Sequence, residues 1–384
     1  MTGQFEDEYT INARAGIVDK LFDGDIDLRP EEYYQLKRSK FFSDPAARKN
    51  ALFTNWDTDE KYHWPHQPST TQGVRYGPLI NYTLDWEKIV EPPSFVWLKN
   101  ILDAHKNIEE NTCIRFANSS EGDHIHYYWG YGCHSLVGRN GGKQWLSLGP
   151  GCWTVNAVHE TLHALGSNHE QSRQDRDTFI KINEENMIEN ISDAFAIIAG
   201  SPTGNPYDFG SCSTMHYNNM AFSKNKKPTI ETLDKNYQHT IGYRLKLSFL
   251  DTKALNHRYC DRKNPLYAEC PGEPNILLTP DTPEKEEIRW FNASKFTCYW
   301  RIQAPADHYI GVNLTNMEGF KCEQSCYSFV EIKYGNMANS GPRFCCDLPK
   351  ETLYTEVVGH EVIIITHGYK PGNYSVNLSY SITK

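Results

Sequence analysis

The stretch HETLHALGSNH at residues 159–169 contains the pattern HExxHxxGxxH. His159 and His163 are four residues apart, so on a helix they lie on one face, one turn apart, where both rings can reach one metal ion. Gly166 can adopt the left-handed backbone that ends a helix and turns the chain, which lets His169 supply a third nitrogen. Three histidines with one open position indicate a catalytic zinc, because a structural zinc is more often closed by four cysteine-rich ligands.

Glu160 follows the first histidine directly, so its carboxylate can point at the same metal-binding space. The alternative interpretation is a helix that carries two histidines at i and i+4 by chance. A bare HxxxH would favour that alternative, but the added glutamate, glycine and third histidine argue against it. The motif therefore predicts a catalytic zinc centre with one Zn²⁺ ion per subunit.

The bulk composition excludes several classes of protein. The chain has 384 residues, enough for two or three domains, and a formal net charge of -9. No basic patch indicates nucleic acid or an anionic membrane surface as a partner. No apolar run approaches the roughly 20 residues that a membrane span needs.

Cysteines and glycosylation sequons indicate the secretory route. Eleven cysteines without a CxxC pair are typical of disulfides in an exported protein. Seven sequons agree with export, at Asn81, Asn118, Asn190, Asn292, Asn313, Asn373 and Asn377. The opening residues MTGQFED have neither the basic start nor the apolar core of a signal peptide, so either the true start is missing or the gene has been misassigned.

The first 49 residues are polar and charged, with helical stretches and little core. Within them, residues 21–26 (LFDGDI) indicate an Asp-Gly turn when read alone. Arg48-Lys49 is either part of a solvated basic face or a trypsin-type processing point, and spacing does not decide between the two.

The middle of the chain mixes strand and helix patterns. Strand composition occurs at Tyr76–Thr83 and Thr112–Phe116. An amphipathic helix is expected over Trp97–His105, with Ile101 and Leu102 pointing inward. A second helix over Trp153–Leu165 carries the zinc motif, and Ile180–Ile191 also has helical spacing.

Beyond Cys260 the character of the sequence changes. The residues that follow are rich in proline and charge, which is typical of a linker. Short strand patterns then recur between turn signals, at Trp300–Ile302, Tyr309–Leu314, Phe329–Lys333, Val362–Thr366 and Tyr374–Tyr380. That spacing predicts a β-sandwich.

The run HETLHALGSNHEQSRQDRD at residues 159–177 resembles the astacin metalloproteases, a secreted branch of the metzincins. Met215-His216-Tyr217 matches the family's methionine-containing turn. Further matches are TCIRF (112–116), GC (132–133), LSLG (146–149), AFSKN (221–225) and LSFLD (247–251). The resemblance covers about residues 50–260. Matrix metalloproteases and reprolysins lack this tyrosine, and serralysins carry calcium-binding glycine-aspartate repeats that are absent here.

The resemblance implies a role for each residue of the motif. His159, His163 and His169 would bind zinc. Glu160 would be the general base that takes a proton from the zinc-bound water and passes it to the leaving amine. Tyr217 would be a switchable fifth ligand that leaves the metal when substrate binds and donates to the oxyanion.

The resemblance also implies how the protease is kept silent. Residues 22–26 (FDGDI) match the Phe-x-Gly-Asp-Ile of family pro-segments, in which Asp25 would occupy the place of the water on zinc. Met215 would form an apolar floor under the metal without being a ligand. Glu170 would bind the mature N-terminus, which favours Arg48-Lys49 as the processing point and Asn50 as the new terminus.

The last segment is similar to a CUB domain, although this match is looser than the protease match. The resemblance implies the disulfides Cys113–Cys260, Cys133–Cys152 and Cys270–Cys298. Pairing among Cys322, Cys326, Cys345 and Cys346 is left open. Cys212 would remain unpaired, and with Ser213 it lengthens the approach to the methionine turn. No calcium is expected, because the residues after Cys326 lack the aspartate of calcium-binding CUB domains.

Together these patterns predict an α+β protein with a two-lobed astacin-like catalytic domain at 50–260 behind a pro-segment at 1–49. A linker at 261–269, which has too few cysteines for a complete epidermal-growth-factor-like module, leads to an all-β CUB-like sandwich at 270–384. The predicted function is a secreted zinc metalloendopeptidase made as a zymogen, with protein or peptide substrates and extracellular partners at the CUB-like domain. The alternative is a catalytically silent scaffold that binds partners, which the intact Glu160 and histidines disfavour.

Overall fold

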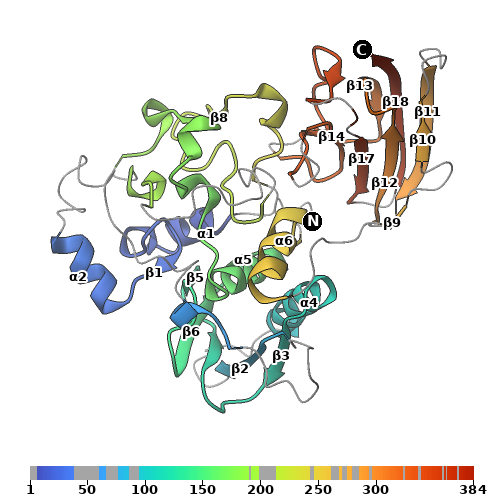
Figure 1. Cartoon of the computed structure of the whole chain (residues 1–384). Helices are drawn as coiled ribbons and strands as arrows, with labels where there is room; N and C mark the ends of the chain where they lie inside the picture. The colour runs from blue at the N-terminus through green and yellow to red at the C-terminus, as the bar shows by residue number, and fades with distance from the viewer. Residues whose placement is uncertain are drawn as a thin grey trace. The chain divides into compact units, whose positions relative to one another are not determined.

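The structure is a computed structural model of the whole chain (Figure 1). It describes residues 7–38, 60–65, 77–85, 95–189, 192–198, 213–242, 246–260, 268–269, 275–278, 285–293, 296–322, 325–335, 339–356, 359, 361–369 and 372–384. These residues form two compact units. The first draws on Met1–Asn205, Ser213–Glu231 and Arg244–Pro265, and the second on Pro206–Cys212, Thr232–Tyr243 and Leu266–Lys384.

The first unit combines helices with a six-stranded sheet. Its helices are α1 (Glu8–Arg14), α2 (Pro30–Arg38), α4 (Phe95–Asn111), α5 (Thr154–Ala164) and α6 (Phe249–Tyr259). The sheet has the order β1-β5-β6-β4-β2-β3, from β1 (Ile26–Asp27), β5 (Cys133–Leu136), β6 (Lys143–Leu148), β4 (His124–Tyr128), β2 (Leu79–Asp85) and β3 (Arg115–Asn118). A separate ribbon pairs β7 (Ile180–Ile182) with β8 (Ile230–Thr232).

Strand β5 differs in direction from the four strands that follow it in the sheet. Strands β3, β2, β4 and β6 run parallel to their neighbours, whereas β5 runs antiparallel to β6. Strand β1 then pairs with β5 in parallel, with Ile26 opposite Ser135. An unpaired edge strand exposes a row of backbone donors and acceptors. Two residues from the first 49 cover part of that row on β5.

Helices α4 and α5 lie together against the sheet and enclose the main core of this unit (Figure 1). Ile80, Ile125 and Leu146 come from strands β2, β4 and β6, and they pack in one cluster with Ile101 of α4 and Leu162 of α5. The zinc-motif helix is therefore held by the core of the unit.

The expectation of little core in the first 49 residues was wrong. Ile11 of α1 belongs to the main core. Phe22 and Ile26 form a smaller buried cluster with Val137 and Ile198. Apolar residues here are few and widely spaced, so composition gave no sign of their burial, which comes from contact with distant segments.

Two further expectations need correction. Ile101 is buried, but its neighbour Leu102 is 44% exposed, because successive helical residues differ by about 100° and cannot both face the same core. The predicted helical stretch from Ile180 is instead strand β7 followed by a 3₁₀ turn at Glu184–Asn186. Isoleucines at 180 and 182 alternate with the period of a strand.

The second unit is an all-β sandwich. One sheet contains β10 (Asn275–Leu277), β12 (Phe296–Gln303), β17 (Val362–Gly368), β14 (Phe329–Lys333) and β15 (Arg343–Phe344), with β9 (Ala268–Glu269) paired to β12. The other contains β11 (Lys285–Ala293), β18 (Gly372–Thr383), β13 (Tyr309–Glu318) and β16 (Leu353–Tyr354). Ile302 and Ile364 from the first sheet share one buried core with Val312 and Val376 from the second. The predicted sandwich is confirmed.

The proposed boundaries fall largely outside the described residues. The processing point after Lys49 lies there, as do residues 261–267 of the linker. The last two linker residues, Ala268 and Glu269, form strand β9.

A pair of substitutions in α4 tests which side of the helix supports the core. Ile101→Ala removes a fully buried side chain and should lower the free energy of unfolding by about 2–5 kcal/mol. Leu102→Ala, on the exposed side, should change it by about 0.5 kcal/mol or less. Chemical denaturation of both variants measures the difference, and equal losses would contradict this assignment.

Candidate metal centre

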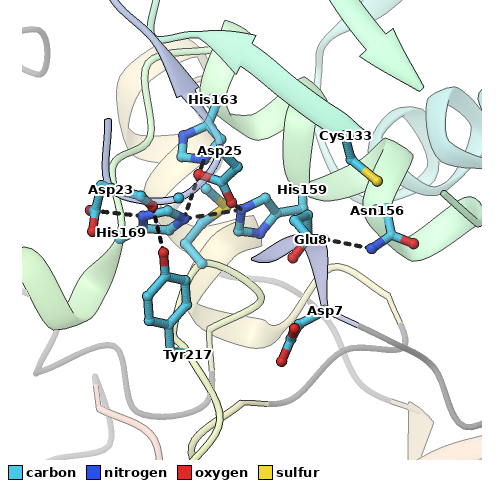
Figure 2. A network of polar contacts seen from close by, with 12 residues as sticks. Asp7, Glu8, Asp23, Asp25, Cys133, Asn156, His159, His163, His169 and Tyr217 are labelled. Carbon is cyan, nitrogen blue, oxygen red and sulfur yellow. Dashed lines mark hydrogen bonds and ion pairs between the residues drawn. The ribbon is translucent and has the colours of Figure 1, made fainter. Parts of the chain in front are cut away.

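Helix α5 and the turn after it bring the three motif histidines together. His159 and His163 lie in α5, which ends at Ala164. Gly166 has a φ of 95°, in the left-handed region that glycine adopts without strain. The chain then turns so that His169 faces the other two rings (Figure 2). All three imidazoles are buried.

Asp25 lies at the point where the three rings meet (Figure 2). Its Oδ2 atom is 3.2 Å from Nε2 of His159, and its Oδ1 atom is 3.4 Å from Nε2 of His163 and 3.2 Å from Nε2 of His169. Nε2 of His159 is also 3.2 Å from Nε2 of His169. A zinc ion about 2.0–2.1 Å from each tetrahedral ligand requires ligand separations of about 3.3 Å. The four groups therefore have the spacing of a tetrahedral metal site.

The hydrogen bonds of the Nδ1 atoms show that the Nε2 atoms of His159 and His163 carry the lone pairs. Nδ1 of His159 lies 3.0 Å from the carbonyl of Thr214, and Nδ1 of His163 lies 2.8 Å from the carbonyl of Ser167. A carbonyl only accepts, so in both rings Nδ1 donates, and in a neutral ring the lone pair is then on Nε2. Nε2 of His163 and Oδ1 of Asp25 have no hydrogen-bond partner among the described residues. A cation at this point would satisfy these converging electron pairs, so the residues fit zinc.

Burial and neighbouring charges shift the pKa values of these groups in opposite directions. Burial alone would raise the pKa of Asp25, but the surrounding histidines outweigh it and hold that pKa well below its usual range. Burial lowers the pKa of His163 to about 4, although Asp25 opposes the change. Burial would also lower the pKa of His169, but Asp25 and Asp23 raise it to about 10. A metal ion must therefore displace a proton from His169 in order to bind.

Glu160 is buried beside the histidines, and neither of its carboxylate oxygens has a hydrogen-bond partner among the described residues. Burial, followed by the charges of Asp25 and Asp27, raises its pKa well above the usual value. Glu8 of α1 also reaches this place: its carboxylate accepts from Asn156 at 2.9 Å and lies within 4.8 Å of the Glu160 carboxylate. Sequence reasoning missed Glu8, because nothing in its neighbourhood along the chain marks it.

The side chain of Tyr217 points toward the loop that contains Asp23. Its hydroxyl donates to the carbonyl of Asp23 at 2.5 Å (Figure 2). Burial and then the charges of Asp23 and Asp25 raise the pKa of Tyr217 well above its ordinary value. The ring lies beside His169, with 4.8 Å between ring centroids. The phenol is thus protonated and close to the centre.

The turn that contains Met215 is held by a buried carboxylate that sequence reasoning missed. Asp251 accepts from Oγ of Ser213 at 2.5 Å and from the backbone amide of Thr214 at 3.0 Å. It also closes a capping box with Ser248 at the start of α6. Met215 itself is buried in the main core. The Ser-x-x-Asp spacing at 248–251 was the available signal, since it marks a helix N-terminus.

Asn12 ties helix α1 to strand β5 and to the loop before Asp25. Its side-chain amide donates to the carbonyl of Cys133 at 2.7 Å and accepts from the amide of the same residue at 2.7 Å. It also donates to the carbonyl of Gly24 at 3.0 Å. The side chain thus satisfies backbone groups of the edge strand and of the loop before Asp25. No local pattern in the sequence marks this residue.

Glu170 follows His169 directly, and its backbone amide donates to the carbonyl of Met215 at 3.0 Å. It forms an ion pair with Arg173 at 3.0 Å. Asn50, its expected partner after processing, lies outside the described residues.

Comparison with known proteins identifies the family. The sequence model of the Astacin peptidase family matches residues 82–260. Zinc metalloproteinase nas-37 of Caenorhabditis elegans is 33% identical over 398 residues, covering 94% of this chain and 48% of nas-37. Among solved structures, high choriolytic enzyme 1, a hatching-enzyme zinc-protease of Oryzias latipes, is 31% identical, with 52% of this chain and 94% of that chain covered and a TM-score of 0.45.

The chain belongs to the astacin family of zinc metalloproteinases. Zinc metalloproteinase nas-6 of Caenorhabditis elegans is a further relative, 35% identical over 56% of this chain and 66% of nas-6. The chain spans about half the length of nas-37. Zinc, the predicted cofactor, is the metal named for these relatives, and the donor set described above fits it.

The astacin-type unit contains the two disulfides expected from the resemblance, Cys113–Cys260 and Cys133–Cys152. In the sandwich, Cys322 pairs with Cys346 and Cys326 with Cys345, which decides an order that the sequence left open. Cys270 and Cys212 lie outside the described residues, so the expected Cys270–Cys298 pair and the unpaired thiol stay predictions. Among the helices of the described residues, none has the length and apolarity needed to cross a bilayer.

Asp251→Ala tests the support of the methionine turn. The change leaves the Ser213 hydroxyl and the Thr214 amide buried without their acceptor, so the free energy of unfolding should fall by about 3 kcal/mol. Ser248→Ala removes only the capping hydroxyl and should cost about 1 kcal/mol. Chemical denaturation compares the two, and an Asp251→Ala protein no less stable than Ser248→Ala would contradict the role.

Proposed function

We propose that this chain is a secreted zinc metalloendopeptidase made as a zymogen. In this proposal residues 1–49 are the pro-segment, 50–260 the protease domain, 261–269 a linker and 270–384 a CUB-like domain. The observation that carries it is Asp25, whose two carboxylate oxygens lie 3.2–3.4 Å from Nε2 of His159, His163 and His169. Membership of the astacin family and the relatives' names as zinc metalloproteinases support the same reading.

Asp25 would keep the protease silent by occupying the fourth ligand position. A carboxylate oxygen is a suitable zinc ligand, and three histidines supply the other three. A catalytic zinc needs an open position for water or substrate. While the pro-segment is docked, that position is taken by a side chain from the same chain. Removal of residues 1–49 would open it.

His159, His163 and His169 would hold the zinc, which when bound supplies a Lewis acid that activates water and polarises the substrate carbonyl. Glu160 would take a proton from the attacking water and deliver it to the leaving amine. The hydroxyl of Tyr217, freed from Asp23, would donate to the carbonyl oxygen as negative charge develops there.

Activation would proceed by cleavage after Arg48-Lys49. The new N-terminus at Asn50 would then bind Glu170. The Glu170 carboxylate already forms one ion pair, with Arg173 at 3.0 Å. Departure of the pro-segment would also remove Glu8 from the neighbourhood of Glu160.

Location and partners follow from other features. Four disulfides among the described residues and the seven sequons favour an oxidising, extracellular setting. Substrates would be proteins or peptides, and the sandwich would bind extracellular protein partners as a CUB-like domain. A catalytically silent scaffold is the alternative. The buried Glu160 next to a complete ligand set argues against it.

Glu160→Gln tests catalysis in protein cut after Lys49. Loss of the general base should lower the rate of peptide cleavage about 10²–10⁴-fold, while bound zinc, measured by elemental analysis, stays at one ion per chain. A zinc chelator should abolish cleavage by the parent enzyme. Parent activity that survives the chelator, or full activity in Glu160→Gln, would rule out this mechanism.

Asp25→Ala tests the latency mechanism in uncut protein. Without the carboxylate the fourth position is open, so the intact chain should cleave a peptide substrate that the uncut parent leaves intact. Glu31→Ala, at an exposed position in the first turn of α2, is the matched control and should remain silent. Gel analysis verifies that each chain is still uncut. An Asp25→Ala chain as silent as the parent would sink this mechanism.

A further inference from the structure

The three motif histidines differ in what holds their second ring nitrogen. Nδ1 of His159 donates to the Thr214 carbonyl, and Nδ1 of His163 donates to the Ser167 carbonyl. Both acceptors are backbone atoms of the proposed protease domain. His169 is different, because its Nδ1 lies 2.8 Å from Oδ2 of Asp23, a side chain of the proposed pro-segment. Cleavage of the pro-segment would remove only this third partner.

Asp23 is built into the site from several sides. Its carboxylate is buried, and Oδ2 also accepts from Oγ of Ser172 at 2.7 Å. Its carbonyl accepts the hydroxyl of Tyr217. Its φ is 47°, in the left-handed region that non-glycine residues seldom adopt and in which Asp and Asn are enriched. Asp23 thus bonds Nδ1 of the His169 ring, and Asp25 lies at Nε2 of the same ring (Figure 2).

We propose that Asp23 is a positioning residue through which the docked pro-segment tightens the hold of His169 on zinc, so that the zymogen releases its metal more slowly than the processed enzyme. A carboxylate that accepts from the second nitrogen of a metal-bound histidine fixes the ring and raises its basicity. Loss of such a partner typically weakens metal binding by about 10–100-fold. The proposal rests on the ligand role of His169 given above.

Besides Asp23 and Asp25, two acidic residues of the proposed pro-segment bond groups that are not proposed zinc ligands. Asp27 bonds Nδ1 of His134 at 2.7 Å, and Glu8 accepts from Asn156. Asp27 therefore offers a matched control: the same substitution, in the same segment, at the same kind of histidine bond, but away from the metal.

The experiment measures zinc release from the uncut zymogen to a chromogenic chelator. Asp23→Asn keeps the shape of the side chain and its tolerance of the left-handed backbone, but it removes the charge. Release should quicken by about 10–100-fold, while Asp27→Asn stays at the parent rate. Equal rates for Asp23→Asn and the parent would overturn the proposal. Faster release together with premature peptide cleavage would mean detachment of the pro-segment, and it would overturn the proposal too.

His169→Ala separates this inference from the proposed function. If that variant keeps zinc as firmly as the parent, the ligand role of His169 itself is wrong. If it loses zinc while Asp23→Asn does not, only the present inference fails.

A second measurement uses the unmodified protein and so does not depend on the folding of a variant. After replacement of zinc by cobalt(II), the ring N–H protons of the ligand histidines give shifted resonances whose exchange with water can be timed by nuclear magnetic resonance. Cleavage of the pro-segment should speed exchange more at His169 than at His159 and His163, whose carbonyl acceptors remain. Equal acceleration at all three rings would count against Asp23.

Discussion

The contact between the Asp25 carboxylate and three buried imidazoles is the constraint on which the rest of the first unit depends. A buried carboxylate is costly unless charges or hydrogen bonds compensate it. Here the compensation comes from rings that are themselves buried and fixed through their second nitrogens. Each group is stable in its place only because the others are there, so the loop with Asp25, helix α5 and the turn to His169 must be positioned together.

The scaffold around this contact is organised to hold those three segments still. Helix α5 is fixed by the apolar core that it shares with α4 and the sheet. Asp251, at the start of α6, fixes the turn that supplies the acceptor for His159. Asn12 of α1 and strand β1 bond strand β5 at the edge of the sheet. Precision at the centre thus comes from rigid elements on every side.

In the zymogen that we propose, one loop of the pro-segment both blocks the active site and supports a metal ligand. The loop at residues 23–25 places one carboxylate at the open metal position, a second on the far side of His169, and a carbonyl on the Tyr217 hydroxyl. A single cleavage would then free the substrate position, the tyrosine and the third histidine in one step.

The sequence by itself determined the class of the fold and predicted the metal centre, because the motif spacing reflects the helix period and the strand patterns reflect the period of a sheet. It also indicated the position of Asp25 and two of the disulfides through resemblance to a family. Only the tertiary structure revealed the parts played by Asp23, Asn12 and Asp251, because each acts on residues far away along the chain. The structure also corrected the predicted burial of Leu102 and the helix predicted from Ile180, although the helix period and the alternation of Ile180 and Ile182 were local signals in the sequence. Long-range hydrogen bonds and burial leave no local pattern, so they are decided only when the segments meet.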